Sequence, residues 1–291
     1  MESRKNRPYQ LLAYGLLLPA FLIYGAFVLV PSVQSLLYSF TDWEGLGDKT
    51  IVWFDNYAKI FSAKEWPYVW QALKNNLIWV LVSATVPPAL GVILANMLVR
   101  GRHRGAKFYQ LIFFLPQIIS MVVASVAWNW IYNPLFGPLT QLGLAPKTGF
   151  LSSQSTVLPA LLVIDVWMSY GFCCLIYTSA LQNIDPMLYD AGIIDGTSPF
   201  SEFFYITLPC LRENTTTVVM MMVISAFKVF DLVYTMTNGG PSDSSNVVSL
   251  YAYKEGFMYN RMGYASAVTM VITLILLVVS VLINRNGRER S

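Results

Sequence analysis

Six long apolar runs constrain the fold of this chain more than any other feature of its sequence. Each holds about 20 residues or more, the length that an α-helix needs to cross the hydrocarbon core of a bilayer. Only helices and closed barrels span lipid, because every backbone amide and carbonyl there must be bonded within the structure. The sequence therefore predicts an all-α polytopic membrane protein with six transmembrane helices. The predicted spans are 11–37, 77–99, 108–132, 157–181, 215–237 and 263–283.

The composition agrees with this prediction. Of the 291 residues, 55% are hydrophobic and only 12% are charged, whereas charged residues make up about 25% of a soluble domain. The net charge of +3 is too small to indicate a nucleic-acid partner. The first run is longer than the apolar part of a signal peptide, and no A-x-A site follows it. We therefore expect it to remain in the membrane. With all six runs counted, we expect residues 1–291 to form a single transmembrane domain.

The three cysteines predict no special chemistry. Cys173 and Cys174 are adjacent and lack the spacing of metal ligands, and an odd number of cysteines provides no disulfide framework. We expect them and Cys210 to act as small apolar side chains in or beside the membrane. The sequence accordingly predicts no metal site.

The lysines and arginines predict the orientation in the membrane. With six spans both termini lie on one face, and the short segments of that face hold eleven of the nineteen basic residues. Seven more are spread over the longer loops of the other face, and Lys228 lies within the fifth predicted span. Cytoplasmic segments carry the excess of lysine and arginine. Both termini, the basic loop 100–107 and the connection 182–212 are therefore predicted to be cytoplasmic.

The connection 182–212 carries more local structure signals than a plain loop requires. Asp185 is suited to cap a helix that begins at Pro186, and Gly196 is suited to a left-handed stop. Ser198 and Pro199 then repeat the start signal. The sequence predicts two short amphipathic helices joined at a glycine elbow.

Two surroundings are compatible with these helices. They could rest in the lipid interface, where helices usually carry lysine and arginine on the polar face. This connection is acidic instead. Its carboxylates belong to Asp185, Asp190, Asp195 and Glu202, and Glu213 follows directly after it. The acidic composition favours docking to a soluble protein, which would transmit force into the adjacent spans.

The stretch DAGIIDGTSPFSEFFYITLP (190–209) resembles the EAA loop of binding-protein-dependent ABC importer permeases. In that loop E-A-A is followed after three residues by G and after nine more by I-x-L-P, and every spacing fits here. Aspartate for glutamate keeps the carboxylate, and glycine for alanine loosens the helix by about 1 kcal/mol. The resemblance implies a coupling loop that docks in a groove of an ATPase. The implied coupling residues are Asp190, Ala191, Gly192, Asp195, Gly196, Ile206, Leu208 and Pro209.

Four further stretches narrow the resemblance to the carbohydrate-uptake branch, of the maltose and glycerol-phosphate permease type. They are SFTDW (39–43), FDNYAKIF (54–61), residues 113–139 and FDLVYTMTNGGP (230–241). The resemblance implies transport of a sugar or related polyol in the cytoplasmic membrane of a bacterium or archaeon. It also implies three kinds of partner: a second homologous permease, a cytoplasmic ATPase dimer that binds ATP and Mg, and an extracytoplasmic solute-binding protein.

Ionisable residues inside predicted spans are candidates for the substrate pathway, because such groups usually face a bundle interior or a wet cavity. Lys228 and Asp231 stand three apart on one helical face. Two alternatives stay open for them, a structural ion pair and a lining of the pathway. Asp165 has no basic residue three or four positions away, so we expect it to face a cavity or form an interhelical hydrogen bond.

The resemblance adds four pathway residues. Aligned through the neighbouring motifs, Ser169, Phe172, Ser225 and Val229 fall where the maltose-type permease contacts its sugar. Few side chains there are polar, so the partner permease is expected to hold more of the site.

Two other functions are compatible with a six-span chain. A secondary transporter would move solute along an ion gradient without an ATPase, but it does not account for the acidic connection. An intramembrane enzyme would need a reactive pair such as Lys228 with a serine. No G-x-x-x-x-G-K-[ST] motif occurs, so we expect no catalytic residue and no nucleotide site in this chain.

Overall fold

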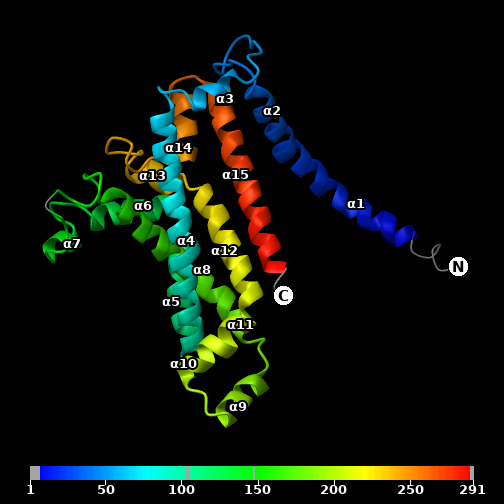
Figure 1. The fold of residues 1–291 in the computed structure, drawn as a ribbon, viewed down its shortest axis with the longest axis vertical. Helices are drawn as coiled ribbons and strands as arrows, with labels where there is room; N and C mark the ends of the chain where they lie inside the picture. Colours follow the sequence, from blue (N-terminus) through cyan, green and yellow to red (C-terminus); the bar gives the residue numbers. More distant parts are fainter. Residues whose placement is uncertain (1–6, 102–104, 147, 289–291) are drawn as a thin grey trace. The chain divides into compact units, whose positions relative to one another are not determined.

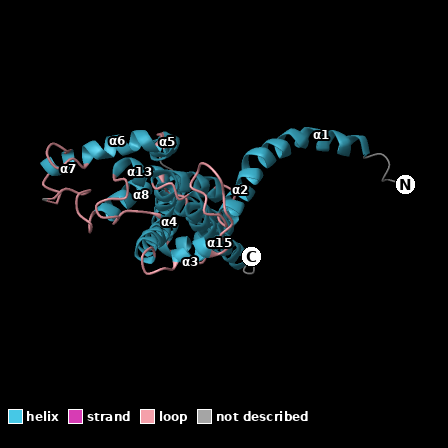
Figure 2. Cartoon of the chain, turned by 90° about the horizontal axis from the view of Figure 1, so that it is seen from above, coloured by secondary structure: helices cyan, strands magenta, loops and turns pink. Residues whose placement is uncertain are grey.

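The fold is all-α in a computed structural model that describes residues 7–101, 105–146 and 148–288. Within these ranges there is no β-strand, only an isolated bridge between Thr41 and Ile51 (Figures 1 and 2). The central part of the basic loop, with His103, lies outside the described residues.

The helices are joined by connections of very different length, and π-helical turns (η) interrupt them in three places of the described chain. In chain order the elements are α1 (Arg7–Tyr24), η1 (Gly25–Leu29), α2 (Val30–Tyr38), α3 (Asp55–Ile60), α4 (Trp66–Arg100), α5 (Ala106–Ile118), α6 (Met121–Ile131), α7 (Pro138–Gln141), α8 (Val157–Leu181), α9 (Pro186–Ile194), α10 (Pro199–Glu202), η2 (Phe203–Thr207), α11 (Leu208–Cys210), α12 (Arg212–Phe227), α13 (Asp231–Met236), α14 (Val248–Tyr253), η3 (Lys254–Met258) and α15 (Met262–Arg288).

The chain divides into two compact units. The first comprises the described residues up to Ser62 together with Ala252–Val271. In it, the buried Asn56 donates hydrogen bonds to the carbonyl oxygens of Ser39, at 3.0 Å, and Thr41, at 2.7 Å. This amide holds the segment after α2 against α3. The second unit comprises Ala63–Tyr251 with the described residues from Ile272, and it contains the connection 182–212.

The second unit is built around α4, α8 and α12, which pack side by side (Figure 1). Cys173 and Cys174 are fully buried in its core beside Tyr177, Leu211 and Val218. The expectation that these two cysteines are small apolar fillers is confirmed, whereas Cys210 is exposed.

Small residues allow the helices of this unit to approach closely, as is common where helices pack in membranes. A Cβ at Gly91 of α4 would lie 2.6 Å from the Cβ of Cys173 in α8. A Cβ at Gly171 of α8 would overlap the backbone carbonyl of Phe113 in α5. Neither glycine can gain a side chain without moving a helix.

We therefore expect Gly171→Ala to destabilise the protein by about 3 kcal/mol, because backbone rather than a flexible side chain must yield. The measurement is the midpoint of thermal unfolding of the detergent-purified protein. Gly15→Ala is the matched control, since a Cβ at Gly15 meets nothing within 4 Å. Equal midpoints for the two variants would contradict the close approach of α5 and α8.

In the part of the chain that the structure describes, four helices are long and apolar enough to cross a membrane: Gly15–Tyr38, Trp66–Arg100, Val157–Leu181 and Met262–Arg285. They correspond to the first, second, fourth and sixth predicted spans. The chain is thus a multi-pass membrane protein. Within the described residues, length and composition give four candidate spans, or five if the bent pair described next is one span.

The third predicted span is not straight. Residues 108–132 form two helices, α5 and α6, that meet at 96°. The break has local causes: Pro116 lies in the last turn of α5, and Ile119 is extended with ψ 134°. The hydroxyl of Ser120 then accepts a hydrogen bond from the amide of Val123 at 3.4 Å, which starts α6.

The fifth predicted span is also broken. Within 215–237, α12 ends at Phe227 after 16 residues, and α13 begins only at Asp231. Between them Phe230 has φ −146° and ψ −60°, which is not helical. A sixteen-residue helix rises about 24 Å, which is less than the hydrocarbon core requires. The prediction of one continuous helix here is wrong.

Candidate functional site

The first helix of the connection 182–212 forms where its start signals predict it. The Asp185 carboxylate accepts a hydrogen bond from the amide of Met187 at 2.9 Å, and Pro186 is the first residue of α9. Such a cap satisfies one of the amides that the first turn of a helix leaves unbonded. Both start signals are confirmed.

The glycine elbow is a complete helix stop. Gly196 has φ +74°, and its amide donates to the carbonyl of Ile193 at 3.1 Å. The amide of Thr197 donates to the carbonyl of Gly192 at 2.9 Å. This pair of bonds around a left-handed glycine is the Schellman arrangement. It sets the direction in which the chain leaves α9.

The second predicted helix starts at Pro199, and the Ser198 hydroxyl accepts from the amide of Ser201 at 3.2 Å. It continues through α10, η2 and α11 to Cys210. Gly192 lets α9 lie close against it, because a Cβ there would come within 3.0 Å of the Ile206 side chain and 2.9 Å of the Thr197 hydroxyl. Glycine at this position therefore serves packing and does not merely loosen α9.

Arg100, the last residue of α4, holds both helices of the connection. Its guanidinium lies 3.7 Å from the ring centroid of Tyr189 in α9, and it forms an ion pair with Glu202 in α10. The Tyr189 hydroxyl shares a hydrogen bond with the Thr207 hydroxyl at 3.3 Å. Tyr189 and Glu202 are both buried. One cation thus joins the end of α4 to the two arms of the glycine elbow.

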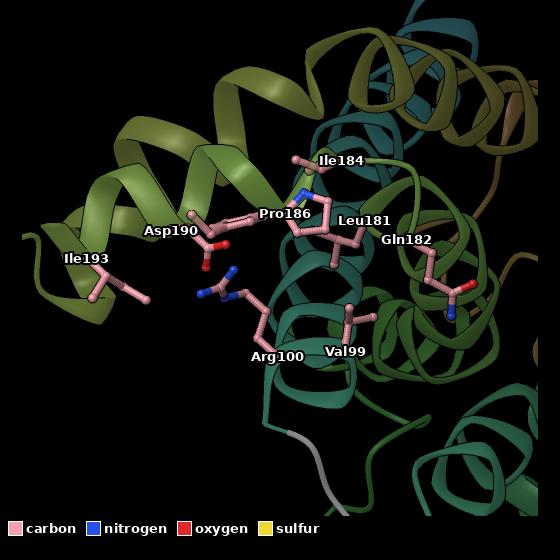
Figure 3. Close-up of a pocket in the computed structure, with 9 residues that line it drawn as sticks. Val99, Arg100, Leu181, Gln182, Ile184, Pro186, Asp190 and Ile193 are labelled. Carbon is pink, nitrogen blue, oxygen red and sulfur yellow. The ribbon is translucent and has the colours of Figure 1, made fainter.

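A pocket of about 320 Å³ opens beside this contact (Figure 3). It lies between the last turns of α4 and α8 and the exposed face of α9. In Figure 3 the Arg100 guanidinium and the Asp190 carboxylate point toward one another across it. Its lining residues are Val99, Arg100, Leu181, Gln182, Ile184, Pro186, Tyr189, Asp190 and Ile193.

The predicted coupling residues divide into two groups by exposure. The residues of the first group are exposed: Asp190, Ala191, Asp195, Gly196 and Pro209. The second group packs inward: Gly192 is buried, and Ile206 and Leu208 are half-buried, with Leu208 against the core of the unit. The first group is thus open to the surroundings, whereas the second packs within the connection and fixes its shape.

Asp165 forms one of the two arrangements expected for it. Its carboxylate in α8 accepts a hydrogen bond from the Ser83 hydroxyl in α4 at 2.7 Å. Ser169 lies one turn further along α8, and its hydroxyl donates to the backbone carbonyl of Asp165 at 2.7 Å. Phe172 is half-buried against the core of the unit. The interhelical hydrogen bond of Asp165 is thus present.

Lys228 and Asp231 do not share a helical face, and that prediction is wrong. α12 ends at Phe227, so the three-residue spacing no longer brings the two side chains together. Both are exposed, and no ion pair joins them in the described part of the chain. Beside them Ser225 is exposed and Val229 is buried.

The comparison with known proteins decides the class of this membrane protein. Residues 88–288, which include the whole connection 182–212, match the binding-protein-dependent transport system inner membrane component. The chain belongs to this family. It is therefore the permease of an ABC importer, a non-catalytic subunit, and the ATPase is a separate protein. The secondary transporter and the intramembrane enzyme are set aside.

The permease is similar along most of its length to named relatives. A probable ABC transporter permease of Bacillus subtilis, YurN, is 34% identical over 280 residues, which are 94% of each chain. The diacetylchitobiose uptake permease NgcF of Streptomyces coelicolor is 33% identical over 281 residues, 90% of this chain and 78% of its own. A chain of a bacterial ABC transporter that imports the acidic polysaccharide alginate has the same fold, with a TM-score of 0.83, 23% identity and 99% of each chain covered.

Sequence reasoning missed the role of Arg100, which it used only as a topology signal. The contact partners stand far along the chain from it, so no local spacing joins them. One signal was available in principle: a glutamate among the apolar residues of PFSEFFYITLP needs a cation if it is buried. The lysines and arginines of the permease were the candidates, and the structure selects Arg100.

Proposed function

We propose that this permease carries a sugar or related polyol across the cytoplasmic membrane of a bacterium or archaeon. The carbohydrate-type motifs support this substrate class, as do the names of the diacetylchitobiose and alginate systems reported above. The permease works with a second homologous permease and with an extracytoplasmic solute-binding protein that delivers the sugar. A cytoplasmic ATPase dimer binds ATP and Mg.

The proposal includes the remaining topology. The chain is a single transmembrane domain that crosses the membrane six times, with α5–α6 and α12–α13 as two interrupted crossings. Both termini lie in the cytoplasm with the connection 182–212. The excess of lysine and arginine on that face supports this orientation.

One observation carries the function: α9 and α10, which Arg100 joins to the end of α4, carry exposed apolar side chains. Met187 and Ile194 of α9 are 74% and 85% exposed, and Phe200 of α10 is 75% exposed. Apolar side chains exposed together on a fixed element mark an interaction site. Asp190 and Asp195 flank them and suit basic residues of an ATPase groove.

The transport cycle follows from linkage between the partners. ATP binding closes the ATPase dimer and draws the coupling loops of the two permeases together, and the spans then open outward. Hydrolysis resets them. The loaded binding protein and ATP must both favour the outward state, since a ligand shifts an equilibrium only by its differential affinity for the two states.

The proposed pathway runs along α8 and the break after α12. Ser169, Phe172, Ser225 and Val229 contact the substrate, and Asp165 sets the local geometry through Ser83. Lys228 and Asp231 line the pathway rather than neutralising one another. Their exposure, and the loss of helical spacing between them, supports the lining role over a structural ion pair.

We expect Lys228→Met and Asp231→Asn to act independently. Exposed charges that form no ion pair interact only weakly, so their effects on the free energy of unfolding should add within about 0.5 kcal/mol. A double-mutant cycle measured by thermal unfolding of the reconstituted complex tests this. A coupling energy above about 1 kcal/mol would restore the structural ion pair.

The function is tested by co-expression with the ATPase, the second permease and the binding protein. The purified complex is reconstituted in vesicles, and ATP hydrolysis is measured with the binding protein equilibrated against mono-, di- and trisaccharides. We expect a stable complex whose hydrolysis rises when one of these sugars is bound. Solute uptake by this chain along an ion gradient, with no associated ATPase, would overturn the proposal.

A further inference from the structure

The 35-residue helix α4 makes polar contacts with other elements at its last residue, at its middle and about a third of the way from its start. At its last residue Arg100 contacts Tyr189 and Glu202 on the two arms of the connection. At its middle Ser83 donates to Asp165 in α8. Each contact is to a group that the proposed function uses or lies beside.

The third contact is made by Asn76, which is fully buried. Its side-chain amide donates to the carbonyl of Ala226 at 3.2 Å, and its side-chain oxygen accepts from the amide of Val248 at 2.7 Å. Ala226 is in the last turn of α12, next to the break at Lys228. Asn76 therefore ties α4 to the place where the proposed pathway interrupts a helix.

The Arg100 contact is suited to moving both arms together. A guanidinium is planar, so it presents a face to an aromatic ring while its edge pairs with a carboxylate. Arg100 uses both at once, the face on Tyr189 and the edge on Glu202. These two residues stand on opposite sides of the elbow at Gly196. The arms consequently cannot move separately from the end of α4 while the contact holds.

We propose that Arg100 is a positioning residue that makes α4 the element through which movement of α9 reaches the break after α12. This inference rests on the proposed function. The covalent connections of α9 to α8 and of α11 to α12 remain, but each joins only one arm. Arg100 alone, among the described contacts of the connection reported above, joins both arms to a helix that also contacts the break.

The test uses the double variant Arg100→Met/Glu202→Met in the reconstituted complex. Removing both charges avoids leaving the buried Glu202 carboxylate without its cation. The docking surface around Ile194 and Phe200 is unchanged. The readout is the reaction of a methanethiosulfonate reagent with a thiol introduced by Ser225→Cys, beside the break, in a Cys210→Ser background. Cys173 and Cys174 are buried and need no replacement.

In the parent complex we expect the rate of thiol labelling to change when ATP and Mg bind without hydrolysis. In the double variant the ATPase should still co-purify, but this change should shrink about fivefold or more, the lower end of the range for coupling between sites. Arg100→Lys retains the charge opposite Glu202 and should give a smaller loss, because an ammonium has no planar face to stack on Tyr189 while it pairs with Glu202. Lys107→Met, which removes an exposed charge near the same membrane face, is the matched control and should behave as the parent.

The outcomes separate the two proposals. Suppose that the labelling rate responds to ATP in the parent complex and responds equally in the double variant and in Arg100→Lys. This result overturns the role proposed for Arg100 and leaves the proposed function standing. If the double variant does not assemble, Arg100→Lys decides: a full response overturns the inference, and a reduced one supports it. A parent chain that recruits no ATPase overturns the proposed function and this inference with it.

Discussion

Gly196→Pro should abolish the stimulation of ATP hydrolysis by the loaded binding protein while leaving the permease in the membrane. Gly196 has φ +74°, whereas proline is fixed near −65°. Proline also lacks the amide that bonds the carbonyl of Ile193. In the variant, forming the native elbow would cost about 3 kcal/mol or more. The population of the arrangement that docks to the ATPase therefore falls roughly a hundredfold.

A graded series at the same position separates the elbow from a general effect of mutation. Asparagine tolerates the left-handed region, so Gly196→Asn should keep most of the stimulated hydrolysis. Gly196→Ala costs about 1 kcal/mol and should lie between the asparagine and proline variants. The measurements are co-purification of the ATPase and its stimulated rate in vesicles. Stimulation in Gly196→Pro equal to that of Gly196→Asn would show that the elbow geometry does not matter for coupling.

The connection 182–212 could be predicted because its signals are local. A capping carboxylate, a proline at the first helical position and a glycine stop each act within four residues. They sit at Asp185, Pro186 and Gly196, and each forms as expected. The apolar runs were equally predictable, since burial in lipid imposes length and composition on every span.

The interruptions of the predicted spans were less predictable, because hydropathy is an average over many residues. It does not show where a helix breaks or in which direction the chain continues. Pro116 marked the bend between α5 and α6, but a proline alone does not distinguish a kink from a 96° turn. The break at Lys228–Phe230 contains no proline or glycine. It is held by tertiary contacts such as that of Asn76 with Ala226, and contacts between distant segments leave no local pattern.

The second large effect is expected at the apolar surface of the connection. Ile194 is 85% exposed although its helix, α9, is held by the Arg100–Tyr189 contact. An apolar side chain exposed in this way is unfavourable unless a partner covers it. Buried apolar anchors of an interface are worth about 2 kcal/mol or more, and a carboxylate in their place adds a desolvation penalty. Ile194→Asp should therefore weaken association with the ATPase at least about thirtyfold.

Leu46→Asp is the matched control for this substitution. Leu46 is 91% exposed and lies in a loop that the six-span topology places on the external face. Leu46→Asp therefore replaces an aliphatic side chain of the same size by a carboxylate on the face away from the ATPase. Its complex should retain the ATPase in full. If Ile194→Asp instead keeps the ATPase and only loosens the connection from lipid, α9 rests in the membrane interface. The connection 182–212 would then have to contact the ATPase through its second arm, at Phe200.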